Sequence, residues 1–157
     1  MPAPTEHHAT LQKTVGVWEG TITMTIPGME MTSAAKETVR ANGPFWVVSD
    51  FESDLGGQPY QGHGCHGYDP DKKKFVGTWI DSMGSFLSIM EGEMTDEGVL
   101  VMHWDAPDMM GKIAPHRFEQ VMKEGAYTST FYTSDVKTMV IDMKHKSAKP
   151  MEAAAGR

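Results

Sequence analysis

Apolar and polar residues alternate along most of this chain, in short runs separated by turn residues. Alternation puts successive side chains on opposite faces of a strand, so that one face is buried while the other meets water. A short helical pattern at His7–Thr14 comes first, with Leu11 and Val15 four positions apart. After it the pattern predicts ten strands, at Trp18–Ile26, Thr32–Ala41, Phe45–Leu55, Tyr60–Tyr68, Lys74–Asp81, Phe86–Met94, Val99–Trp104, Ala114–Lys123, Ala126–Thr133 and Val136–Lys146.

The connections between these runs are short and rich in Gly, Pro, Asn and Asp, the residues that favour turns. Ten antiparallel strands joined by hairpins leave two unpaired edges, which closure into an up-and-down barrel removes. We therefore expect an all-β fold, a closed and mostly antiparallel barrel of about ten strands with a short N-terminal helix across one end. A β-sandwich is the alternative.

The length of 157 residues fits one domain with a core of its own. We expect an ordered part at about 7–146 and a flexible C-terminal tail at 147–157, whose sequence SAKPMEAAAGR is small and polar.

Four segments carry a resemblance to a known family: GVWEG (16–20), PGME (27–30), the pattern G-x-P-Y-x-G-H-G-x-x-G-Y-D (57–69) and KKFVGTWIDS (73–82). Over residues 8–146 the chain resembles a bacterial family of unknown function with a lipocalin-like (calycin-like) barrel. The resemblance implies the barrel fold and no particular activity. In such barrels the Trp of G-x-W, here Trp18, plugs the closed end, and a basic residue of the last strand packs over it; Lys144 or Lys146 is expected to do so.

Charge and composition exclude several classes of function. The net charge of −7 argues against binding nucleic acid or anionic lipid, which attract basic surfaces. A single cysteine, Cys65, excludes an internal disulfide and a Cys-rich zinc motif, and we expect it to act as a small packing residue. The chain has no run of 18 apolar residues and no signal-peptide pattern, so we expect a cytoplasmic protein without a membrane-spanning segment.

The richest chemistry lies in the predicted hairpin of Gly62–Ser82, with a turn at Asp69-Pro70-Asp71-Lys72. If His63 lies opposite Trp79, then Gln61 lies opposite Asp81, and all four share one face. A slip of one residue would move Asp81 to the other face, and the turn length leaves both registers open.

Two functions follow from such a face. The first is a small-molecule-binding barrel, with a cavity lined by His, acids and some of the 14 methionines. Its predicted ligand-binding residues are Trp46, Tyr60, Gln61, Trp79 and Trp104. The partner would be a small molecule, with neither nucleic acid nor membrane; a homodimer is left open.

The second is a divalent-metal-dependent hydrolase of esters or phosphoesters. Three imidazoles can hold a metal such as zinc with one coordination position open, and the metal activates water there. The predicted ligands are His63, His103 and His116, with Glu52 or Asp81 as the catalytic base. A haem held by one histidine is a third alternative, which the acids near the candidate ligands disfavour.

Overall fold

The structure is a computed structural model, and it describes residues 1–147. The predicted all-β fold is confirmed, with one short helix and ten strands in the described part of the chain. Each predicted strand is present; Lys74–Asp81 and Ala126–Thr133 have the predicted bounds, and the bounds of the others differ by a few residues. The elements are α1 (Glu6–Gln12), β1 (Gly16–Ile26), β2 (Met29–Asn42), β3 (Trp46–Leu55), β4 (Gln58–Asp69), β5 (Lys74–Asp81), β6 (Ser88–Met94), β7 (Val99–Pro107), β8 (Ile113–Lys123), β9 (Ala126–Thr133) and β10 (Val136–Ser147).

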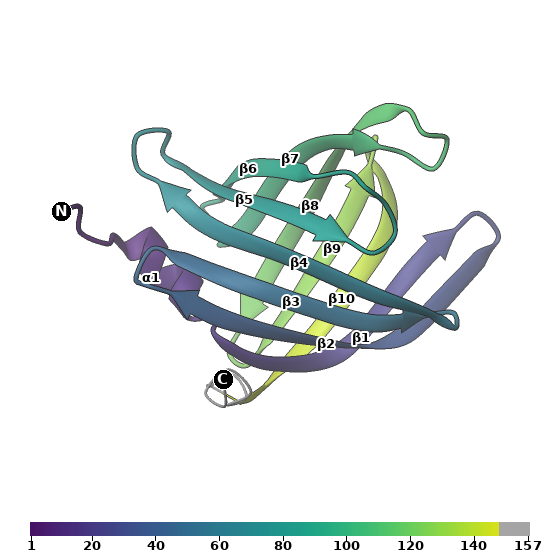
Figure 1. Ribbon diagram of the computed structural model, residues 1–157, viewed down its shortest axis with the longest axis horizontal. Helices are drawn as coiled ribbons and strands as arrows, with labels where there is room; N and C mark the ends of the chain where they lie inside the picture. Colours follow the sequence, from purple (N-terminus) through teal and green to yellow (C-terminus); the bar gives the residue numbers. More distant parts are fainter. Residues whose placement is uncertain (148–157) are drawn as a thin grey trace.

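Each strand pairs antiparallel with its neighbours in sequence, and β1 also pairs with β10. The sheet therefore closes into a barrel without a free edge (Figure 1). Of the predicted tail, residues 148–157 lie outside the described residues. Within residues 1–147, no helix has the length and apolar character needed to cross a membrane.

Helix α1 covers one end of the barrel, beside the start of β3 and the end of β4 (Figure 1). Thr5 caps its N-terminus through a capping box with His8. The His8 imidazole is buried, and its Nε2 lies 3.1 Å from the backbone oxygen of Tyr68. Leu11, also buried, joins the core from the same helix. The helix thus plugs this end with both apolar and hydrogen-bonded contacts.

Trp18 lies under this plug and is 2% exposed. Its indole Nε1 donates a hydrogen bond of 2.8 Å to the backbone oxygen of Thr14. The ring stacked on it is that of His145, with centroids 4.4 Å apart. The prediction of Lys144 or Lys146 over this indole is wrong: both lysines are exposed, because His145 pairs with Trp18 and its neighbours in sequence face outward.

Exposure of the inward side chains differs between the two ends. Near α1, several of them are at most 4% exposed, namely Trp18, Val39, Val47, Phe75 and Met143. Toward the opposite end, several inward residues with large side chains are only partly buried, namely Tyr60, Trp79, Trp104, Phe131 and Met139. In Figure 1, turns and loops surround that end, and α1 covers the other end of the barrel.

In the hairpin of β4 and β5, His63 does not lie opposite Trp79; the register is shifted by one residue. His63 pairs with Ile80, and Gly64 pairs with Trp79. Asp69 caps the turn as expected, because its Oδ1 accepts hydrogen bonds from the backbone N–H groups of Asp71 and Lys72. Lys73 then adds a residue with φ 55°, and this extra residue moves the pairing by one position.

Candidate functional site

The inner wall of β4 is built from glycines that make room for Trp79. A β-carbon on Gly62 would lie 2.0 Å from Cζ2 of Trp79, and one on Gly64 would lie 2.6 Å from its Cε3. The indole therefore packs directly on the backbone of β4, on the inside of the barrel. The GHG sequence thus positions an inward aromatic residue, and its histidine faces outward.

A chain of hydrogen bonds runs from Trp79 at the end of the barrel opposite α1. The indole Nε1 donates to the hydroxyl oxygen of Tyr60 at 3.3 Å, and this hydroxyl donates to Oδ2 of Asp81 at 3.3 Å. Burial, and then the nearby Asp81 carboxylate, raise the pKa of Tyr60, which stays a protonated donor. Three residues predicted for the site are thus brought together on the inner face.

His66 is the imidazole that β4 turns inward, deeper than Trp79. A β-carbon on Gly77 would lie 2.5 Å from its Cδ2, so the ring packs on the backbone of β5. No group of residues 1–147 is hydrogen-bonded to its ring nitrogens, and neither nitrogen is sealed from accessible space. Burial lowers the pKa of His66 to about 4, so the ring is neutral at neutral pH. A neutral imidazole whose accessible nitrogens have no protein partner within residues 1–147 thus lies on the inner face of β4.

Glu37 places a carboxyl group on the inner face of β2. The hydroxyl of Tyr127 donates to its Oε1 at 2.7 Å, and the hydroxyl of Ser49 donates to its Oε2. Burial raises the pKa of Glu37, although both hydrogen bonds favour the charged form. The residue also keeps part of its surface accessible, to a greater extent than the buried Tyr127 and Ser49.

His116 and Trp104 also face inward, on β8 and β7, with their rings stacked 5.6 Å apart. Both nitrogens of His116 have protein partners, the backbone oxygen of Ala106 at 3.1 Å and the hydroxyl of Thr133 at 3.0 Å. These bonds hold the ring in place and leave it no free nitrogen for a ligand.

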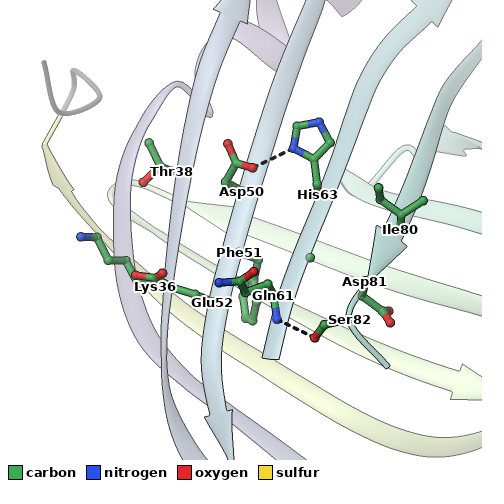
Figure 2. A pocket seen from close by; sticks show the side chains of 11 residues that line it. Lys36, Thr38, Asp50, Phe51, Glu52, Gln61, His63, Ile80, Asp81 and Ser82 are labelled. Atoms are coloured by element: carbon green, nitrogen blue, oxygen red, sulfur yellow. Dashed lines mark hydrogen bonds and ion pairs between the residues drawn. The ribbon is translucent and has the colours of Figure 1, made fainter. Parts of the chain in front are cut away.

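A hollow lies on the outer wall, across β2 to β5, where polar side chains gather (Figure 2). Asp50 is the centre of its charged network: it accepts from Arg40 at 2.7 Å and from Nδ1 of His63 at 2.7 Å. Figure 2 shows Asp50 and His63 facing each other on neighbouring strands, with Glu52 and Gln61 below them. The predicted base Glu52, the predicted metal ligand His63 and the predicted ligand-binding Gln61 therefore lie outside the barrel.

The predicted metal ligands are not brought together. His63 lines the outer hollow of Figure 2, whereas His103 and His116 border a different one, and His103 is exposed on the outer face. Among residues 1–147, no three His, Cys, Asp or Glu side chains are arranged to hold a metal ion. The metal-dependent hydrolase remains a prediction from the sequence.

Of the remaining predicted residues, Trp46 packs over Gly67 on the outer wall and is 40% exposed. Cys65 is a free thiol on the same face of β4 as His63, with its Sγ 3.3 Å from Oγ1 of Thr78. Of the predicted site residues, the inner face thus holds Tyr60, Trp79, Asp81, Trp104 and His116.

Sequence reasoning missed two inner residues, Glu37 and His66. Glu37 has the same parity as Ala35 and Val39, so it interrupts the apolar face of its strand. His66 has the same parity as Gly62 and Gly64, the positions at which a small residue admits a large inward neighbour. In both cases the alternating pattern contained the signal.

Comparison with known proteins gives the family of this barrel. A search of curated proteins found no match. The model of the family described as "Protein of unknown function (DUF1579)" matches residues 3–153, which is nearly the whole chain. The chain therefore belongs to the DUF1579 family.

Proposed function

We propose that this protein binds a small, largely apolar molecule inside the barrel. The observation that carries the proposal is His66, an inward imidazole among buried surroundings whose nitrogens have no hydrogen-bond partner within residues 1–147. Because these nitrogens are accessible, they can bind a polar group of a ligand. A polar group without a protein partner, on an inner wall that is mostly apolar, is what a ligand site requires.

The inner wall around His66 favours an apolar ligand. Aromatic side chains from several strands, including Trp79, Trp104 and Phe131, are inward and only partly buried. Ligand sites in barrels are lined mainly by apolar and aromatic groups, with few polar groups that orient the molecule. His66, Glu37 and the Tyr60 hydroxyl are such polar groups here.

The entrance lies at the end opposite α1. The connections there carry exposed apolar side chains, namely Met29, Met83, Phe86, Leu87, Met109 and Met110. Exposed apolar residues gathered in one region often mark a binding surface, and methionine adapts to varied shapes. An apolar molecule would therefore meet apolar surface before it enters the barrel.

Binding of N-phenyl-1-naphthylamine, a dye whose fluorescence rises in apolar surroundings, tests the proposal. We expect saturable binding at one site. His66→Trp fills the space beside the inner ring, and we expect it to weaken binding by at least about tenfold, since overfilled sites exclude their ligands. His63→Trp makes the same change on the outer face of the same strand and should leave Kd within about twofold, because exposed positions tolerate substitution.

The milder His66→Phe variant serves if the Trp variant does not fold, with His63→Phe as its control; circular dichroism reports folding. A dye that does not saturate would overturn the proposal, and so would equal effects of the inner and outer variants.

A further inference from the structure

The inner wall of the barrel carries acid without a matching base. Among residues 1–147, every Lys and Arg of the strands occupies an outward position of the alternating pattern or a strand end. Glu37, in contrast, lies inward in the middle of β2, opposite Trp18 on one side and Phe51 on the other. A buried carboxyl group without a cation is costly to ionise.

The Glu37 carboxyl group keeps hydrogen-bonding capacity. Each of its oxygens accepts one bond within the described chain, from Tyr127 at Oε1 and from Ser49 at Oε2. A carboxylate oxygen can accept about two bonds, so each oxygen has a position left for another donor. The two hydroxyls fix the orientation of the buried carboxyl group.

We propose that the ligand is an apolar molecule with a basic amine, and that its ammonium group binds the Glu37 carboxylate. This inference rests on the proposed binding function, which it makes more specific. An ammonium group supplies the missing positive charge and donates to the free positions of the carboxylate. The ion pair forms among donors that are already in place, so little of the protein must rearrange.

The neighbours of Glu37 suit a cation. Trp18 lies opposite Glu37 in the strand register, and its ring is 5.1 Å from that of Tyr127. The ring of Trp18 is stacked on His145, so it contributes an apolar wall beside the carboxyl group and no second charge. His66 is neutral at neutral pH, since burial lowers its pKa to about 4, so it does not repel the amine. A fatty acid, in contrast, would bring a second negative charge toward Glu37 and past Asp81 at the entrance.

Three ligands of equal chain length test the inference: octylamine, 1-octanol and octanoate, each competing with N-phenyl-1-naphthylamine at pH 7.5. We expect octylamine to displace the dye at a concentration at least about tenfold lower than octanol does, as charge-assisted hydrogen bonds are the stronger class. Octanoate should be the weakest competitor.

Glu37→Gln should remove the preference of the site for the amine over the alcohol. Glu52→Gln is the matched control: it removes the same charge from the outer face of β3 and should keep the preference. If the dye binds but the three compounds compete equally, or octanoate competes best, the proposal of an amine ligand is wrong, and the proposed binding function stands. If folded Glu37→Gln still prefers the amine over the alcohol, the proposal of an amine ligand is also overturned.

Failure of the binding function looks different, since neither the dye nor any octyl compound would then bind. If Glu37→Gln does not fold, the ranking of the three compounds on the unmodified protein decides by itself.

Discussion

A β-carbon on Gly62 would lie 2.0 Å from Cζ2 of Trp79, so the indole occupies the space that any other residue at position 62 would fill. The two residues belong to neighbouring strands, β4 and β5, and both face the inside of the barrel. Their contact fixes the position of an aromatic side chain in the proposed ligand site.

Gly62→Ala tests this contact. We expect a loss of about 1–3 kcal/mol in the free energy of unfolding, because the added methyl group must displace the indole. Urea unfolding followed by circular dichroism measures it. Gly84→Ala is the control, since nothing lies within 4 Å of a β-carbon there, and it should change stability by less than about 0.5 kcal/mol. When Trp79→Leu is combined with Gly62→Ala, it should recover part of the loss; additive effects would argue against the contact.

Tyr127→Phe removes the donor to Glu37 and keeps the ring. We expect a loss of about 1–3 kcal/mol in unfolding free energy at pH 7, because a buried acceptor loses a partner. Tyr68→Phe is the matched control on the inner face: no side-chain hydrogen bond of the Tyr68 hydroxyl is found within residues 1–147. Equal stability of the two variants would show that the hydrogen bond from Tyr127 to Glu37 contributes little to the free energy of unfolding.

The His66 imidazole should make stability depend on pH. Its pKa is about 4 in the folded protein against 6.5 for a free histidine, so the unfolded chain binds a proton in this window that the folded protein does not. Stability is therefore full above pH 6.5 and falls as pH decreases toward 4, by at most about 3 kcal/mol.

Unfolding curves of the wild type and His66→Gln across this range isolate the effect, because the contributions of other groups cancel in the difference. The variant should lose less stability in acid than the wild type. His63→Gln, on the same strand and facing outward, should follow the wild type. If the wild type and His66→Gln lost stability equally as the pH decreases, a lowered pKa of His66 would be contradicted.

Tyr60→Phe breaks the hydrogen-bond chain at the entrance, because the hydroxyl both accepts from Trp79 and donates to Asp81. We expect a loss of about 1–2 kcal/mol in unfolding free energy and a changed near-ultraviolet circular dichroism spectrum from the freed indole. Each of these variants removes a tyrosine signal, so the tryptophan region of the spectrum is compared. The Tyr68→Phe variant, which keeps this chain, should leave that region as it is. If the tryptophan region were unaltered in Tyr60→Phe, the Tyr60 hydroxyl would not hold the indole of Trp79 in place.

Much of the fold could be predicted from local pattern. The runs Lys74–Asp81 and Ala126–Thr133 were bounded correctly because turn residues flank each of them and alternation is clear within them. Closure into a barrel followed from the number of short hairpins and from the cost of unpaired edges.

The site was harder to predict, because a strand tells which residues share a face and not which face is inside. For β4, one residue of register decided the outcome. Lys73 lengthens the turn through its left-handed backbone, and His63 consequently pairs with Ile80 on the outer wall, while His66 points inward. Expectations for Gln61 and for the metal ligand His63 depended on that one position.

The sequence by itself determined ten alternating strands, their turns and the barrel that they form, since these depend on neighbours along the chain. Only the tertiary structure decided that Glu37 meets Tyr127, 90 positions away, and that an imidazole with free nitrogens lies inside. The physical reason is that side-chain alternation has a period of two, so register and closure choose between two opposite faces, and local preferences are the same for both.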